Sequence, residues 1–186
     1  MMISWNQLIK NRTKGDRSQG PFCNSFAMNR QDSNNNIPGI LYGRYDGDVY
    51  QNGNPWILIT ANLATLFYRG AEYIHQKKTI TTNQVISDSE YSARQKAINI
   101  QSSGFLSASD RDLGLASSLI QAGDAVLQRI YYHVSGDNFH LAEQFDKNTG
   151  YQISAKDLTW SYSDVLVALK IRKEAVSSGR NMNALE

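Results

Sequence analysis

Apolar residues that recur every three or four positions mark one face of a helix, and this pattern first becomes regular after residue 54. Asn54 and Pro55 suit a helix start, because Asn caps free amides and Pro tolerates the first helical position. The pattern predicts one long helix from this point to about Lys77. Its predicted inward face consists of Ile57, Ala61, Ala64, Phe67, Ala71 and Ile74.

A second long helix is predicted between residues 109 and 136, where the apolar pattern is the most regular in the chain. Ser109 or Asp110 can cap its start, and Gly136 is placed to end it. Its predicted inward face consists of Leu113, Ala116, Leu119, Ile120, Gly123, Val126, Leu127, Ile130 and Val134.

The last predicted helix runs from about Ala155 to Val176. Ser154 and Asp157 precede it with a spacing that resembles a capping box, in which Asp replaces the usual Glu. Its predicted inward side chains are Leu158, Val165, Leu166, Leu169 and Val176.

Weaker patterns fill the rest of the chain. Residues Asn6–Asn36 are polar without a lasting period, which predicts mostly loop with at most a short helix around Trp5–Asn11. Residues Ile37–Gly53 combine glycines with tyrosines and predict a looping backbone with aromatic walls. A further helix is predicted over Glu90–Ile100. Because strand-like alternation is almost absent, the predicted fold class is all-α.

Composition narrows the class of protein. The 186 residues are 41% hydrophobic and 19% charged, with a net charge of +2, which fits one globular domain or part of a larger one. No apolar run approaches the about 20 residues of a membrane helix, and the basic residues are too scattered for a nucleic-acid surface. Cys23 alone forms no internal disulfide or cysteine zinc site. Met1–Arg12 lacks the apolar core of a signal peptide, so no export signal is expected. The sequence leaves the localisation and the oligomeric state of the protein open.

The first candidate site is the loop before the first long helix. Arg44 and Asp48 stand there among Tyr45, Tyr50 and Trp56. Such a mixture suits a sugar, because charged groups bind hydroxyls and aromatic faces cover the apolar side of the ring. A solvated turn held by an Arg44–Asp48 ion pair explains the same residues, and composition alone favours this simpler interpretation.

The second candidate site is the loop around Glu143, a carboxylate between apolar neighbours with Gln144 at hand as a hydrogen-bonding partner. This setting suits a general base, although a loop glutamate is more often simply solvated. The histidines lack metal-site spacing, and the chain has no phosphate-binding glycine motif and no serine-nucleophile elbow. Neither a metal site, nor nucleotide binding, nor a serine hydrolase is expected.

Two long strings carry a resemblance to a known family. Residues 43–56 read GRYDGDVYQNGNPW, and residues 141–162 read LAEQFDKNTGYQISAKDLTWSY. In this order and at this separation they resemble the last third of the catalytic domain of the glucoamylases, the glucan 1,4-α-glucosidases. Residues 122–127 are similar to the penultimate long helix of that family, and the resemblance covers about residues 38–172.

This resemblance implies roles for particular residues. Glu143 matches the general base that deprotonates the attacking water, and Ser154 matches the serine that hydrogen-bonds this base. Arg44 and Asp48 match residues that hold the terminal glucose. The aromatic residues expected around the substrate are Tyr45, Trp56 near the adjoining subsite and Trp160 in the wall behind the base. The family implies an (α/α)6 barrel, an α-glucan or maltooligosaccharide substrate, inversion of the anomeric configuration and no cofactor.

The departures from the family pattern matter as well. Asp46-Gly47 stands where many members have Pro-Glu, which makes the turn more flexible. The family's general acid comes from segments that precede anything matched here, so the chain is expected to be the C-terminal piece of such a domain. Two functions follow: base and sugar-binding residues of a glucoamylase, or an inactive remnant that binds sugar weakly at most. The predicted division is a poorly ordered or junction segment at 1–36, the catalytic part at 37–178 and a tail at 179–186.

Overall fold

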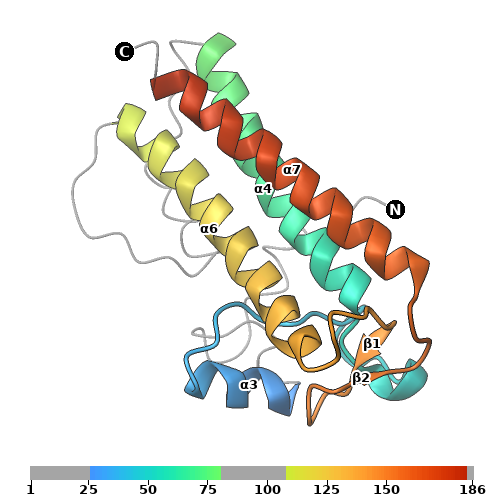
Figure 1. Ribbon diagram of the computed structural model, residues 1–186. Coiled ribbons are helices and arrows are strands. Elements are labelled where there is room, and N and C mark those ends of the chain that lie inside the picture. Colours follow the sequence, from blue (N-terminus) through green and yellow to red (C-terminus); the bar gives the residue numbers. More distant parts are fainter. Residues whose placement is uncertain (1–25, 81–107, 184–186) are drawn as a thin grey trace.

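The computed structural model describes residues 26–80 and 108–183, which form long helices with irregular loops gathered at one end (Figure 1). The α-helices among these residues are α3 (Ala27–Asn34), α4 (Ile57–Ile80), α6 (Ala108–Ser135) and α7 (Thr159–Asn183). A 3-10 turn, η1 (Tyr50–Gly53), precedes α4. The short strands β1 (Gln144–Phe145) and β2 (Gln152–Ile153) pair antiparallel between α6 and α7. The predicted all-α class is confirmed.

Helix α4 is the centre of the packing, since α6 and α7 both run along it and make few contacts with each other. Ala61, Ala64 and Ala71 are fully buried, and their small side chains let the neighbouring helices come close. The predicted inward faces of α4 and α6 are buried or half-buried wherever their side chains are described, so both predictions are confirmed. Helix α6 ends at Ser135, directly before Gly136 as predicted.

One polar cluster joins the three long helices. The buried Tyr68 of α4 donates its hydroxyl proton to Asp124 of α6 over 2.7 Å. Arg172 of α7 donates to both oxygens of the same carboxylate, over 2.6 and 2.8 Å. Burial, with Asp124 beside it, raises the pKa of Tyr68, so this hydroxyl remains a donor. The Tyr68 ring lies where a side chain at Gly123 would stand, which explains the glycine on α6.

Helix α3 shows that the interpretation of Asn6–Asn36 as mostly loop is wrong for residues 27–34. The fully buried Arg129 of α6 donates to Asp32 over 2.8 Å and to the carbonyls of Ile37 and Pro38. The buried Asn29 side chain exchanges two 2.9 Å hydrogen bonds with the Leu41 backbone. The segment is therefore held by buried polar contacts, which leave no apolar period in the sequence.

Three predicted helix starts need correction. Asn54 does not cap α4, because its amide bonds to the Gln51 carbonyl and to Gln144, and the helix begins at Ile57. Helix α6 begins at Ala108, which places the proposed caps at 109 and 110 inside its first turn. Helix α7 begins at Thr159 rather than at Ala155.

The predicted inward face of α7 is only partly correct. Leu158, Val165 and Val176 are half-buried, but Leu166 and Leu169 are 64% and 48% exposed. In the structure the buried face of α7 consists of Ser161, Ala168, Ile171 and Ala175 instead. The apolar face predicted for α7 is thus wider than the face of this helix that α4 covers in the structure.

The helices predicted over Trp5–Asn11 and Glu90–Ile100 lie outside the described residues. Among the helices that are described, none combines the length and the apolar character needed to cross a membrane.

Candidate active site

The two candidate loops, about 90 positions apart in the sequence, meet at the start of α4. The Glu143 carbonyl accepts the backbone N–H of Ile57 over 3.2 Å, and the Pro55 carbonyl accepts that of Phe145 over 3.0 Å. These bonds surround an antiparallel bridge between Trp56 and Gln144. Main-chain hydrogen bonds of this kind fix the register of the loops, so the position of Glu143 follows from the start of α4.

Buried amide side chains strengthen this junction. Asn54, which is 3% exposed, donates to the carbonyl of Gln51 over 2.8 Å and to the side chain of Gln144 over 3.3 Å. Its own oxygen accepts the backbone N–H of Lys147 over 3.2 Å. The residue expected to cap a helix therefore clamps the two loops together, a role that a single stretch of sequence does not reveal.

Two side chains hydrogen-bond the half-buried carboxylate of Glu143. Ser154 donates its hydroxyl proton to Oε2, and Gln144 donates to the same oxygen over 3.3 Å. The Glu143 backbone N–H bonds to the carbonyl of Ala155, which brings the serine loop alongside. Ser154 has a φ of 70°, an uncommon backbone conformation for a residue other than glycine. The predicted capping-box serine thus bonds to Glu143 rather than to a helix N-terminus.

Asp157, the other member of the predicted capping box, also has a different partner. Its carboxylate lies 2.7 Å from His140 Nδ1 and accepts the hydroxyl proton of Tyr162 over 2.8 Å. The hydrogen bond to Asp157 raises the pKa of His140, which favours the protonated ring at this exposed position.

Arg44 and Asp48 form a two-pronged ion pair in the other loop. Arg44 Nε and Nη2 donate to the two carboxylate oxygens over 2.7 and 2.8 Å, and the Tyr50 backbone N–H adds a 3.0 Å bond. The hydrogen bond from Arg44 lowers the pKa of Asp48 to about 2. The Arg44–Asp48 ion pair, which the simpler interpretation of this loop predicted, is therefore present. It fixes the direction of the Arg44 guanidinium group.

Aromatic rings surround the guanidinium group of Arg44. Its central carbon lies 4.5 Å from the ring centre of Tyr50, 5.5 Å from that of Tyr45 and 5.8 Å from that of Trp56. Tyr50 stacks on Trp56 at 6.4 Å, and both Tyr45 and Tyr50 remain more than half exposed. Cation–π contacts at these distances stabilise a charged and aromatic platform that is open to a ligand.

Gly53 shapes the turn that carries this platform. It has a φ of 61° and follows Gln51 and Asn52, which are also left-handed. A side chain at Gly53 would collide with the Asp48 carbonyl. Glycine is required here by both conformation and space, as the glycine-rich sequence of the loop predicted.

Trp160 is the predicted site residue that lies on a long helix and not in the two joined loops. It lies in the first turn of α7 with its ring 60% exposed and is hydrogen bonded to Asp164. Burial raises the pKa of Asp164, whose carboxylate also accepts a 2.8 Å hydrogen bond from Asn62. The remaining predicted residues lie in the two joined loops.

A second group of residues, from α3 and the C-terminal end of α6, packs against the Glu143 loop. His133 Nε2 lies 2.7 Å from Asp32, and its ring packs 5.4 Å from that of the buried Phe145. Gly150, at a φ of 75°, lies so close to the His133 ring that no side chain fits there. The Met28 backbone N–H bonds to the carbonyl of Lys147 over 3.1 Å. Helix α3 and the end of α6 therefore hold the loop in place, which the sequence analysis did not predict.

Where the side chains are described, in residues 26–76 and 114–179, no group of three or more His, Cys, Asp or Glu side chains is arranged to hold a metal ion. The chemistry that these residues offer is that of a carboxylate, its hydroxyl and amide donors, and a charged aromatic surface.

Comparison with known proteins identifies the family. The chain belongs to the glycosyl hydrolases family 15, whose pattern it matches over residues 21–170. Glucoamylase GLA1 of Saccharomycopsis fibuligera is 36% identical over 152 residues, which cover 73% of this chain and 28% of that protein. The intracellular sporulation-specific glucoamylase of Saccharomyces cerevisiae is 32% identical over 161 residues, 79% of this chain and 29% of that protein.

Solved structures agree with this assignment. The structure of a glucoamylase from Saccharomycopsis fibuligera superposes with a TM-score of 0.64 and 29% identity, over 83% of this chain and 33% of that one. The family 15 glucoamylase of Hypocrea jecorina gives a TM-score of 0.62 and 27% identity, over 86% and 27%. The helices match part of an (α/α)6 barrel, as predicted. The chain spans about a third or less of the length of each of these relatives.

Proposed function

We propose that this chain contributes the general base and part of the sugar-binding surface to an inverting glucoamylase. The reaction is removal of terminal α-1,4-linked glucose from starch, glycogen or maltooligosaccharides. The observation that carries the proposal is the position of Glu143: its carboxylate is hydrogen bonded by Ser154 and Gln144, and its backbone is joined to the Arg44 loop at the start of α4.

In the proposed reaction Glu143 takes a proton from a water molecule as the oxygen of that water bonds to the anomeric carbon. The bond from this carbon to the glycosidic oxygen breaks, and the leaving oxygen receives a proton from a general acid on the other side of the sugar. Inverting glycosidases keep the two carboxyl groups about 6.5–9.5 Å apart, so that the water fits between base and sugar. The product is β-glucose, and the chemistry requires no cofactor.

Ser154 and Gln144 have a supporting role in this scheme. Both donate to Oε2 of Glu143, so they favour the ionised carboxylate and hold it in one orientation. A general base must be ionised and within hydrogen-bond reach of the proton it removes.

The sugar-binding roles fall to the platform around Arg44. Asp48 engages Nε and Nη2, which leaves Nη1 outside this ion pair as a donor for sugar hydroxyls. Trp56 and Tyr45 offer ring faces for the apolar side of a glucose unit. We assign Trp160 to the outer wall, because it stands on a different element from the base and the platform.

The proposal assigns the base and not the acid. The resemblance places the acid in a part of the catalytic domain that the match does not cover, and the interpretation as an inactive remnant has no specific observation in its favour. Activity is therefore tested in a whole domain, built by replacing the matched segment of the Saccharomycopsis fibuligera glucoamylase GLA1 with residues 21–170 of this chain.

This hybrid should release β-glucose from maltotriose, detected by NMR before the anomers equilibrate. Glu143→Gln should lower kcat by about 10²- to 10⁴-fold and leave KM within a few fold, because the amide keeps the shape but not the basicity. Asp137→Asn, a carboxylate outside the proposed site, is the matched control and should keep the activity. A folded hybrid that releases α-glucose, or a Glu143→Gln variant with ordinary kcat, would refute the proposal.

A further inference from the structure

Lys147 lies in the turn after β1 and reaches across to the loop that carries the charged and aromatic platform. Its ammonium group donates to the carbonyl of Asn52 over 2.7 Å, although the two residues are 95 positions apart in the sequence. Its backbone N–H donates to the Asn54 side chain over 3.2 Å, and its carbonyl accepts the backbone N–H of Met28 over 3.1 Å. This half-buried lysine therefore joins the Glu143 loop to α3 and to the η1 turn.

The Asn52 carbonyl belongs to a turn with an uncommon backbone. Gln51, Asn52 and Gly53 have φ values of 48°, 65° and 61°, which residues other than glycine rarely adopt. Such a conformation persists where the surrounding structure holds it. Asn54 holds the Gln51 carbonyl through a 2.8 Å hydrogen bond, and Lys147 holds the next carbonyl. Because Asn54 and Lys147 also bond to each other, these contacts form a closed ring that begins and ends on η1.

The first residue of this turn is Tyr50, whose ring contacts two other groups of the platform. The central guanidinium carbon of Arg44 lies 4.5 Å from the Tyr50 ring centre, and Trp56 stacks on the same ring at 6.4 Å. The Tyr50 side chain is 53% exposed, so its position depends on the backbone of the turn more than on a surrounding core. A displacement of the turn would therefore move the ring away from both neighbours.

We propose that Lys147 is a positioning residue for sugar binding, which holds the η1 turn so that the Tyr50 ring stays on the Arg44 guanidinium group. This proposal rests on the proposed function, because it treats the platform as a sugar-binding surface. A charged donor makes a strong hydrogen bond, and a surface that is ordered before the ligand arrives binds more tightly. Glu143 is fixed by its own main-chain bonds to α4 and to the loop before α7. Loss of the lysine contact should therefore weaken binding and leave the proton transfers almost unchanged.

The first test follows the position of Tyr50 without a substrate. In the full chain Trp5→Phe and Trp160→Phe leave Trp56 as the sole tryptophan, since the sequence has three. Acrylamide quenching of its fluorescence measures how well the Tyr50 ring covers it, and Tyr50→Ala gives the uncovered value. Lys147→Met keeps an unbranched side chain of similar length without a donor and should raise quenching about twofold, whereas Lys147→Arg keeps a charged donor and should not.

The second test measures maltotriose hydrolysis by the hybrid enzyme. Lys147→Met should raise KM about tenfold and leave kcat within about twofold, because a contact that only orders the binding surface stabilises substrate and transition state equally. Lys147→Arg should restore KM. In a Tyr50→Ala background Lys147→Met should raise KM no further, since both changes act through the same ring.

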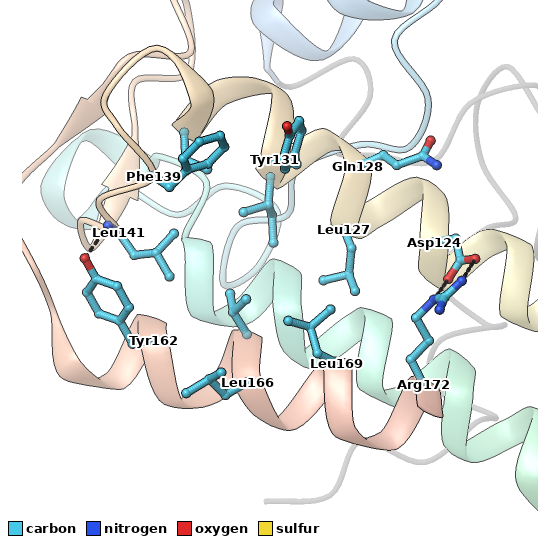
Figure 2. A pocket seen from close by; sticks show the side chains of 13 residues that line it. Asp124, Leu127, Gln128, Tyr131, Phe139, Leu141, Tyr162, Leu166, Leu169 and Arg172 are labelled. Carbon is cyan, nitrogen blue, oxygen red and sulfur yellow. Dashed lines mark hydrogen bonds and ion pairs between the residues drawn. The ribbon is translucent and has the colours of Figure 1, made fainter. Parts of the chain in front are cut away.

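Lys170→Met is the matched control for the loss of a lysine charge. Lys170 is exposed on α7, beside Leu169, which points into an apolar groove between α6 and α7 (Figure 2). The described residues that line this groove come from α6, α7 and the loop between them, and not from the platform. Quenching and KM should therefore both stay at their wild-type values.

Unchanged quenching in Lys147→Met would overturn this proposal alone, and so would a fall in kcat with an ordinary KM. A Lys147→Met chain that is unfolded by circular dichroism would also overturn it, because Lys147 would then support the fold rather than the platform. Ordinary KM values for both Lys147→Met and Tyr50→Ala, with quenching raised as expected, would refute the sugar-binding role of the platform. That result would reject the proposed function of the platform together with this proposal, so the two failures remain distinguishable.

Discussion

At Ser154 a strained backbone and a hydrogen bond to the proposed base coincide. The residue has a φ of 70° and donates its hydroxyl proton to Glu143. A residue other than glycine held in this region costs about 1–3 kcal/mol, and such strain persists only where the surrounding structure imposes it. Here the backbone bond from Glu143 to Ala155 and the β1–β2 pairing impose it, so the hydroxyl faces the carboxylate.

Replacement of Ser154 should separate strain from function. In the hybrid enzyme Ser154→Ala and Ser154→Gly should both lower kcat about tenfold, because a hydrogen bond to a charged group contributes about 1.5–3 kcal/mol and part of it is recovered from water. Glycine relieves the backbone strain and alanine does not, so the glycine variant should be the more stable of the two by about 1 kcal/mol. Urea unfolding measures this difference, and an alanine variant of equal stability and full activity would contradict the assignment.

The Arg44–Asp48 pair should make stability depend on acidic pH. Arg44 lowers the pKa of Asp48 from 3.8 to about 2 in the folded chain. A carboxylate with a lowered folded pKa stabilises the fold above its unfolded pKa, and this contribution is lost as pH falls through the folded value. The window is therefore about pH 4 down to about pH 2.

Thermal melts should show the consequence. At pH 6 Asp48→Asn and Arg44→Gln should each melt below the wild-type chain, and each difference should shrink as pH falls from about 4 to about 2. Since both substitutions remove the same pair, the double variant should melt close to either single variant. A difference that stays constant across this range would show that the pair does not set the pH dependence.

At the residue level, two contacts of the candidate site were anticipated from the sequence, each for a different reason. Residue types alone left Arg44 and Asp48 as either a sugar site or an ion pair, and the structure shows the pair. Glu143 and Ser154 were paired only through the family resemblance, and the structure places them in contact. The role of Asn54 was not predictable, because its partner Gln144 lies 90 positions away in the sequence.

At the level of elements, α3 depends on one buried charged group. Arg129 has no exposed side-chain surface, and its guanidinium group pairs with the Asp32 carboxylate over 2.8 Å. Asp32 also accepts a hydrogen bond from His133, whose ring packs on the Glu143 loop through Phe145. Burial lowers the pKa of His133, so the neutral ring with its proton on Nε2 suits this contact.

Removal of the carboxylate should therefore be severe. Asp32→Ala breaks the buried ion pair between Asp32 and Arg129, and removal of one partner of such a pair costs about 3–5 kcal/mol. Chemical denaturation of the full chain measures the loss. Lys170→Gln, at an exposed position of α7, is a surface control whose effect should stay within about 0.5 kcal/mol. A loss below about 1 kcal/mol for Asp32→Ala would show that α3 is not held by this pair.

The same contacts explain which elements the sequence could predict. Helices α4 and α6 bury apolar stripes, so their period is visible. Helix α3 buries Asn29 and Asp32, whose partners come from distant positions, and its short polar sequence reads as loop. The start of α7 was placed too early because Ser154 and Asp157 fit a local capping pattern, while their partners in the structure are Glu143 and His140.

In the molecule as a whole, the helices of the scaffold and the loops of the candidate site occupy different regions. The long helices form the scaffold, and the loops that carry Arg44 and Glu143 lie together at one end of it (Figure 1). The alternation of helix and site loop was predictable from the sequence. The exposure of Leu166 was not, because an apolar stripe does not reveal how much of it α4 covers.

The central claim, that Glu143 is the base of an inverting hydrolase, is tested most directly by chemical rescue of Glu143→Ala in the hybrid enzyme. Azide is a small anion that can enter the space left by the carboxylate and attack the anomeric carbon without a base. We expect glucose release from maltotriose to be nearly lost, and azide to raise substrate cleavage at least tenfold with β-glucosyl azide as the product. A variant that keeps its activity, or a folded inactive variant that azide does not rescue, would contradict the claim.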